Sequence, residues 1–481
     1  MREWVLASRA RQPLFPLSWG TVALALVAVA GVAAGWGILT YSTVKVLAVG
    51  FGVLCIMLAA WKIDLALYGM ILYLVVIQES ETAQGTIFSI LERINRPNIP
   101  SLLEVLMAAL VTAFAFRHLL GIERYSFRQV KIPLGLYLAL LFIALGIGIH
   151  GGFHEDLIKE DLKRFLFPVL FFPLAYSILK TRKQIVRVLY LLFWVMLFKT
   201  LVAIFYYFRG LGFPYGESRV VFMESGDQLL IVTAIVVGFS LMAAGKQGFR
   251  QWLFLAWGIA PFMVALFFSY RRNALWGAIL SSIILFLLSP SIVRRRLGKY
   301  LAGAAVAAGL IMTLLPMADS SSTVGFLADR LTSVADRDQS SNRAHVNEWV
   351  VTVRDTMASP VFGLGLGSSH APVPDFEVIN RHTVHNAFLM TWMKMGTIAL
   401  LLFLSLLYRY MRTGLDGALQ SRDPLLIGLF ATCGLWIIAM NVGPSWFYYR
   451  ESCLMVLVMT MVIKLQQLHR DAPVREGGRL G

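Results

Sequence analysis

The sequence predicts an all-α, polytopic integral membrane protein with about 14 (12–14) transmembrane helices. Of the 481 residues, 58% are hydrophobic and only 15% are charged, whereas soluble domains carry about 25% charged residues. Apolar segments close to the length of a membrane span recur along the chain, and one long polar stretch interrupts them. We therefore expect transmembrane helices 1–11 in residues 1–317, a large outer loop at 318–385, helices 12–14 in 386–468 and a cytoplasmic tail at 469–481.

Each span is placed where roughly 20 apolar residues follow one another. The first apolar segment, from Leu17 to Tyr41, is too long for a signal peptide and lacks a small-residue cleavage site, so we interpret it as a retained helix. The segments at 64–78 and 164–179 are short, which is typical of tilted, broken or interfacial helices. The predicted spans are 17–40, 44–61, 64–78, 101–117, 133–150, 164–179, 185–208, 227–244, 252–269, 273–289, 300–317, 386–408, 424–442 and 452–468.

The net charge of +16 reflects membrane topology. Basic residues gather in both tails and in alternate loops, and cytoplasmic loops of membrane proteins are rich in Lys and Arg. This pattern argues against nucleic acid as a partner, and it places both termini in the cytoplasm and the 318–385 loop outside. The three cysteines, Cys55, Cys433 and Cys453, fall in apolar segments and are expected to be buried rather than bridged or metal-bound.

Several arginines stand near the outer ends of predicted spans. Arg164 and Arg219 are candidates for binding an anionic ligand. The alternative for Arg164 is a solvated amphipathic helix at the membrane interface, and the alternative for Arg219 is a salt bridge with a neighbouring glutamate. Arg219 belongs to a Gly- and Pro-rich outer loop expected to be irregular. Arg271 and Arg272 form a tight outer turn against the positive-inside trend. Ionisable residues at membrane depth are costly and usually functional, although these two could instead reach lipid phosphates.

The long outer loop contains a predicted amphipathic helix. Its apolar residues recur at steps of three and four, Asn342 could cap its start, and Pro360 would stop it. We expect this helix to cap the mouth of the membrane region. Its apolar stripe is Val346, Trp349, Val350, Val353 and Met357, and its other face presents Arg343, Asn347 and Arg354.

The end of the loop carries glycines and histidines. The run from Gly363 to Gly367 follows a helix rather than a strand, so we favour a tight turn over a phosphate-binding loop. His382 and His385 are three residues apart and could face one side. With His370 they could form a zinc site, but no cysteine or His-Glu-x-x-His motif supports one, so no metal is expected. Asp336-Arg-Asp338 leaves a weak divalent-metal alternative open.

The order of these motifs resembles the bacterial O-antigen ligase and O-antigen polymerase superfamily. The resemblance covers about residues 200–410, and two arginines follow the serine where the family often has one. The matching motifs are Ser269-Tyr-Arg271-Arg272, Asn342-Arg343 to Trp349, Pro360 to Gly367, His385-Asn386 and Met395-Gly396.

The resemblance implies a metal-independent, cofactor-free glycosyltransferase at the periplasmic face of the bacterial inner membrane. It would move a glycan from undecaprenyl diphosphate to a glycan acceptor, either lipid A-core (ligase) or another lipid-linked repeat (polymerase), with other polysaccharide-assembly proteins as further partners. The expected catalytic base is His385, with His382 second. The expected diphosphate- and substrate-binding residues are Arg219, Arg271, Arg272, Arg343, Asn386 and Arg164.

A lipid-linked-glycan flippase, or another polysaccharide transporter, remains the alternative function. A transporter would be expected to place charge through the middle of many spans. Here the charges within predicted spans are chiefly Lys199 and Lys394, whereas the basic residues of the outer side cluster at one mouth of the membrane region. This distribution favours the enzyme.

Overall fold

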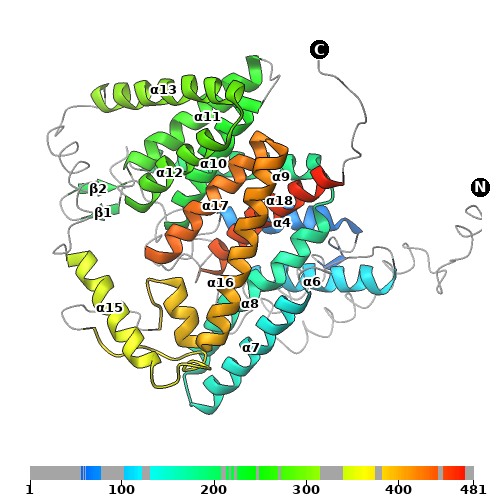
Figure 1. Ribbon diagram of the computed structural model, residues 1–481, viewed down its shortest axis with the longest axis vertical. Coiled ribbons are helices and arrows are strands. Elements are labelled where there is room, and N and C mark those ends of the chain that lie inside the picture. The colour runs from blue at the N-terminus through cyan, green and yellow to red at the C-terminus, as the bar shows by residue number, and fades with distance from the viewer. Residues whose placement is uncertain are drawn as a thin grey trace, which may run out of the picture. The chain divides into compact units, whose positions relative to one another are not determined.

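The computed structural model describes residues 56–57, 59, 61–76, 102–121, 131–206, 213–215, 218–220, 225–244, 249–268, 272–314, 340–373, 382–442 and 448–471. Within these ranges the chain forms 13 helices and one two-stranded ribbon (Figure 1). The all-α prediction is therefore confirmed, with one correction. The loop expected to be irregular contains an antiparallel ribbon of β1 (Phe213–Tyr215) and β2 (Ser218–Val220).

Six of the described helices are long and apolar enough to cross a membrane, so the chain is a multi-pass helical membrane protein. They include a continuous stretch of 35 residues, Ala387–Ser421. The predicted span at 17–40, and nearly all of the one at 44–61, lie outside the described residues. Every other predicted span coincides with a helix, and the full number of spans stays a prediction. The six segments are Pro133–His150, Arg182–Phe205, Gly226–Ala243, Ala387–Ser421, Pro424–Asn441 and Tyr449–Arg470.

The chain divides into two compact units. The smaller comprises residues 1–128 and 173–178, and its described helices α4 (Ile63–Val76) and α6 (Leu102–Leu119) pack together through Ala59, Ala66 and Ala113. The larger unit holds the remaining helices. They are α7 (Lys131–His150), α8 (Glu155–Ile178, through Phe172), α9 (Arg182–Tyr206), α10 (Ser225–Ala244), α11 (Phe249–Phe268), α12 (Arg272–Leu288), α13 (Ser291–Leu314), α15 (Ser340–Thr356), α16 (Ala387–Ser421), α17 (Pro424–Val442) and α18 (Tyr449–Arg470).

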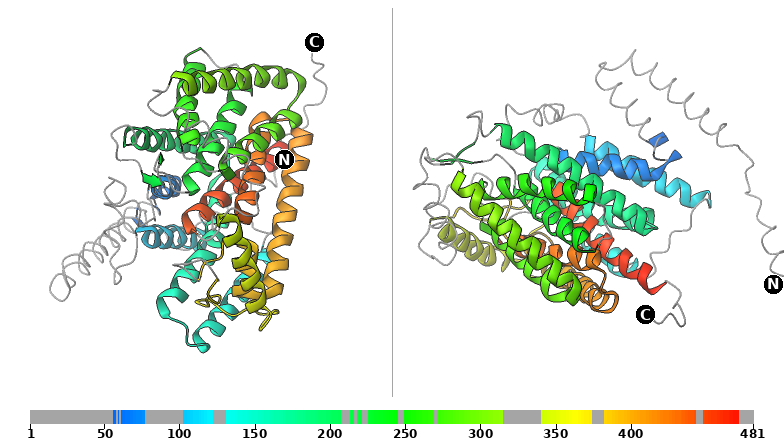
Figure 2. Two further views of the ribbon diagram at one scale, coloured as in Figure 1. Left: turned by 90° about the vertical axis from the view of Figure 1, so that its left-hand side faces the viewer. Right: turned by 90° about the horizontal axis from the view of Figure 1, so that it is seen from above.

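Helix α17 forms the centre of the larger unit, because it packs against α10, α12, α16 and α18. Its residues from Leu425 to Met440 are mostly buried, and so is nearly all of α10. A helix that is apolar on every side is typical of such a central position. The β1–β2 ribbon and α15 lie at the same end of this unit in both Figures 1 and 2.

A glycine-rich turn after α15 is inserted into a kink of α16. Gly396 interrupts the helix with a φ of 80°, a left-handed value that favours glycine. The kink leaves two helix carbonyls without helical donors, and the turn supplies them. The backbone N–H of Leu364 donates to the carbonyl of Met393 at 2.7 Å, and that of Gly365 donates to the carbonyl of Lys394 at 3.2 Å. The turn predicted at 363–367 is therefore confirmed.

The other side of the same turn rests on α7. The backbone N–H of Leu366 donates to the carbonyl of Ala144 at 3.0 Å. A Cβ built on Gly148 would lie 2.2 Å from the carbonyl oxygen of Leu366, so only glycine permits this close approach. Backbone contacts on both sides hold the turn between α16 and α7. They therefore also restrict the position of the residues that follow the turn.

Helix α15 confirms the helix predicted in the loop but corrects two details. It begins at Ser340, so Asn342 lies inside the first turn and does not cap it. It ends at Thr356, before Pro360. The helix also packs through an unexpected face, because the predicted apolar stripe is largely exposed. The buried residues are Ala344, Glu348, Val351, Thr352 and Thr356.

Candidate active site

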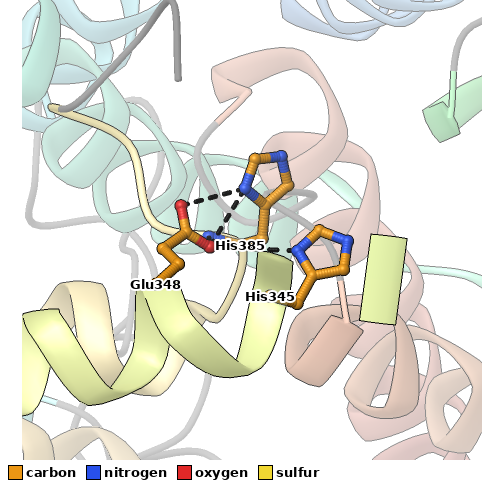
Figure 3. A group of neighbouring side chains, drawn as sticks. All are labelled: His345, Glu348 and His385. Atoms are coloured by element: carbon orange, nitrogen blue, oxygen red, sulfur yellow. Dashed lines mark hydrogen bonds and ion pairs between the residues drawn. The ribbon is translucent and has the colours of Figure 1, made fainter. Parts of the chain in front are cut away.

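The strongest candidate site joins α15 to the residue just before α16. Glu348 of α15 is almost wholly buried, and its Oε1 and Oε2 lie 3.1 and 3.2 Å from Nδ1 of His385. The backbone N–H of His385 also donates to Glu348 Oε2 at 3.0 Å. The His385 side chain remains 32% exposed. The carboxylate therefore holds both the backbone and the ring of a histidine that other molecules can still reach (Figure 3).

Two further histidines face the same carboxylate. Nδ1 of His345, one turn before Glu348 on α15, lies 3.9 Å from its Oε2, and Nε2 of His370 lies 3.8 Å from its Oε1. The rings of His345 and His385 stand 4.8 Å apart between centroids. His370 is buried, and its other ring nitrogen meets the carbonyl of Ala371 at 2.8 Å. One buried acid is thus surrounded by three histidines.

Glu348 is ionised across the neutral range. Burial on its own would raise the pKa of this carboxyl, but hydrogen bonds from His345 and His385 outweigh it and lower the pKa to about 2. An ionised carboxylate only accepts hydrogen bonds, so Nδ1 of His385 must carry its proton toward Glu348. In the neutral form of the ring with its proton on Nδ1, the opposite nitrogen, Nε2, carries a lone pair and can act as a base.

The same residues could hold a metal ion. Donor atoms of His345, Glu348 and His385 all lie within 4.8 Å of one another, and nitrogen and carboxylate oxygen are donors that zinc accepts. The predicted zinc alternative grouped different residues, and the structure does not form that group. His382 instead lies 3.5 Å from Glu160 of α8. The His385–Glu348 hydrogen bonds already satisfy both partners, so we interpret the pair as an oriented base.

A buried network of charges supports the glycine turn from beneath. Lys394 of α16 lies 2.6 Å from Asp161 of α8, and the backbone N–H of Gly367 donates to Asp161 at 2.8 Å. Arg164, predicted as a substrate-binding residue, pairs with Glu160 and lies 3.6 Å from Asp161. Two cations and two carboxylates therefore face one another here, and each buried charge has an opposite one close by.

A second buried network joins α9, α10 and α18. Asp227 accepts from Nζ of Lys199 at 2.8 Å and from Arg450 at 3.0 Å. The predicted intramembrane charge at Lys199 is thus compensated. One turn further along the helices lies a small apolar cavity of about 20 Å³, whose lining includes Met196, Leu230 and Leu454.

The structure places the other predicted residues as follows. Arg219 lies in β2 and Arg272 opens α12, while Arg271 lies outside the described residues. Arg343 lies in the first turns of α15. Convergence of these four arginines therefore stays a prediction. Asn386 caps α16, and its side-chain oxygen accepts from two backbone N–H groups in the first turn of that helix, each at 3.0 Å.

Sequence reasoning missed Glu348 and His345. Their spacing of three residues places them on one helical face, and that spacing was the available signal. The link to His385 spans 37 positions of the chain, so only the folded structure reveals it. His370 was singled out in the sequence, and the structure places it beside Glu348.

Comparison with known proteins supports the sequence resemblance. Residues 253–404 match a family model described as O-antigen ligase, and this segment runs from α11 through the first half of α16. It contains α15, the glycine turn and both Glu348 and His385. No curated protein matches the chain significantly. The resemblance predicted from the sequence is therefore confirmed over residues 253–404.

Proposed function

Because residues 253–404 match the O-antigen ligase family model, we propose that this protein is an inner-membrane glycosyltransferase. It moves a glycan from undecaprenyl diphosphate to a glycan acceptor on the periplasmic face, with both termini in the cytoplasm. The acceptor is lipid A-core or another lipid-linked repeat. Neither a nucleotide nor a metal is required, because the activated bond is already present in the lipid-linked donor.

The observation that carries this proposal is the Glu348–His385 pair. The acceptor hydroxyl needs a base positioned to remove its proton, and an imidazole held in one tautomer by a carboxylate is such a base. Glu348, with its pKa of about 2, stays charged and stabilises the imidazolium that forms. His382 is the second candidate base, although the structure places it near Glu160.

The proposed reaction is a single displacement. The acceptor oxygen forms a bond to the anomeric carbon of the donor sugar while the bond from that carbon to the diphosphate oxygen breaks. The hydroxyl proton goes to Nε2 of His385, and undecaprenyl diphosphate leaves with the bonding electron pair. A single displacement inverts the configuration at the anomeric carbon, as it does in inverting glycosidases.

The leaving diphosphate needs fixed positive charge, which arginine supplies through paired, permanently charged donors. We assign this role to Arg219 in β2, Arg272 at the start of α12 and Arg343 in α15, together with Arg271, which precedes Arg272 in the chain. Arg164 contributes through the network beneath the glycine turn, and Asn386 by fixing the start of α16 next to His385. Support for this assignment is topological, since β2 and α15 lie at one end of the larger unit.

The lipid chain of the donor lies between membrane helices, where its hydrocarbon stays out of water. The bilayer supplies the lipid donor laterally, so no aqueous entry path is needed.

Complementation tests the proposal in cells. In a strain lacking this gene, surface polysaccharide is displayed on a gel for wild type, His385→Ala and Arg272→Ala, with membrane insertion checked for each. Both variants are expected to abolish the product. Loss of attachment to lipid A-core, with long lipid-linked chains accumulating, identifies a ligase, whereas single repeats identify a polymerase. An unchanged polysaccharide pattern for His385→Ala would contradict the proposed catalytic site and would favour a transporter.

A further inference from the structure

Helix α15 buries polar side chains and exposes apolar ones. It buries Glu348, Thr352 and Thr356 against the rest of the larger unit. On the opposite side it exposes four apolar side chains, which we call the valine stripe. At about 100° per residue, the stripe is centred nearly opposite the buried face. Its members are Val346, Val350, Val353 and Met357, which are 52%, 63%, 38% and 63% exposed.

The buried polar side chains of α15 are satisfied locally. The hydroxyl of Thr352 donates to the carbonyl of Glu348, and that of Thr356 donates to the carbonyl of Thr352, each at 2.7 Å. Glu348 is held by histidines. The polar face can therefore be buried at little cost, whereas the valine stripe would be unfavourable in water. A contiguous exposed apolar surface of this kind marks a contact with a membrane or another molecule.

The valine stripe continues onto the surface of a membrane span. Val361 and Phe362 follow α15 and are also exposed. The carbonyl of Val361 packs so closely on Gly396 of α16 that a Cβ there would lie 2.1 Å away. Just beyond the kink, α16 exposes Ile398 and Leu401, on a helix long and apolar enough to cross a membrane. Exposed apolar side chains therefore occur on α15, on the segment that follows it and on the span that this segment contacts.

Charge at the edge of the stripe also fits a lipid surface. Arg354 lies beside Val350 and Val353, and its side chain is 67% exposed. Arg343 is exposed on the same helix. Arginines flanking an apolar stripe are typical of helices that lie in the membrane interface, where they meet anionic head groups.

We propose that α15 is an interfacial helix whose valine stripe is inserted into the adjacent leaflet of the bilayer. The helix then holds Glu348, on its opposite face, at a fixed depth near the membrane surface. If the transferase proposal is correct, this depth brings His385 to the level of a lipid diphosphate. The insertion itself rests on the exposed stripe and stands independently of the reaction.

Spin labelling of the full-length protein tests this directly. A nitroxide is attached to cysteine at Val350, with Cys55→Ser as background, because the two described cysteines Cys433 and Cys453 are buried. The protein is placed in vesicles of phosphatidylethanolamine and phosphatidylglycerol. Collision rates are measured with oxygen, which concentrates in lipid, and with a water-soluble nickel chelate. Leu401→Cys, on the exposed face of α16, is the lipid reference, and Glu155→Cys, on α8, is the water reference.

The proposal predicts an oxygen-to-nickel ratio at Val350 that matches Leu401 and exceeds that of Glu155 several-fold. A ratio matching Glu155 would place the stripe in water and overturn the proposal. Protection from both reagents would also overturn it, because a protein would then cover the stripe. Dipolar broadening between labels would identify that protein as a second copy of this chain. None of these readings depends on transferase activity, so they separate this proposal from the proposed function.

Discussion

Oε1 of Glu348 lies 3.1 Å from Nδ1 of His385, and this contact joins the loop helix α15 to the start of α16. The acid is buried and ionised, and the histidine is partly exposed. A carboxylate behind an imidazole fixes the tautomer and stabilises the protonated ring. The pair therefore has the geometry of a base that removes a proton from an incoming hydroxyl group.

Glu348→Gln should lower kcat for glycan transfer by at least about 10²-fold, because general-base catalysis contributes about 10²–10⁴. KM should change little, since Glu348 is buried behind His385. The glutamine no longer stabilises the imidazolium, so the acidic limb of the pH–rate profile should move to lower pH. Glu348 adds no limb of its own, because its pKa is about 2. Glu155→Gln, at an exposed acid of α8, is the matched control. An unshifted pH–rate profile in Glu348→Gln would contradict the proposed role of Glu348 behind His385.

Chelation should leave transferase activity unchanged. His345, Glu348 and His385 could in principle bind a metal, but the proposed reaction uses them as a hydrogen-bonded base. Purified protein is dialysed against a strong chelator, and its residual zinc content and transfer rate are both measured. Loss of activity that is restored by a divalent metal would show that the cluster is a metal site and would require a different mechanism.

Gly396→Ala should destabilise the protein. Its φ of 80° costs a side-chain-bearing residue about 1–2 kcal/mol, and the added Cβ would also collide with the carbonyl of Val361. The expected result is a lower thermal midpoint in detergent, together with reduced activity from displacement of the glycine turn. Gly146→Ala in α7 is the control, since a Cβ added at that position would have no other atom within 4 Å. Equal thermal midpoints for the two variants would show that the packing of the glycine turn against α16 does not require glycine at position 396.

Lys394→Met should destabilise the fold by up to about 3–5 kcal/mol, because it removes the nearer of the two cations that compensate the buried Asp161. Adding Asp161→Asn should recover part of that loss. The thermal midpoints of wild type, both single variants and the double variant form a thermodynamic cycle. Additive losses would show that the 2.6 Å contact contributes no coupling.

The helical membrane architecture could be predicted from the sequence, because each apolar segment of sufficient length indicates a membrane helix by itself. The helix at 340–356 and the turn at 363–367 were likewise visible, since periodicity and glycine act locally. The face that α15 buries was not predictable. The usual assumption is that a helix packs through its apolar residues, and here Glu348 and two threonines occupy the packed face.

The candidate site could be predicted only in part. His385 was identified because it precedes a membrane helix and matches a family motif. Glu348 was missed because its importance comes from a partner 37 positions away. Arg164 looked like a free anion anchor in the sequence, whereas the fold surrounds it with Glu160 and Asp161. Long-range pairing of charges is a property of the tertiary structure, and local sequence does not report it.

The most direct test of the central claim is glycan transfer by purified protein in proteoliposomes. The lipid-linked donor and the glycan acceptor are supplied, and both the elongated product and the released undecaprenyl diphosphate are measured. Wild type should form them in equal amounts. His385→Ala should form neither, while His154→Ala, at an exposed histidine, should behave as wild type. Full activity in folded His385→Ala would contradict the account.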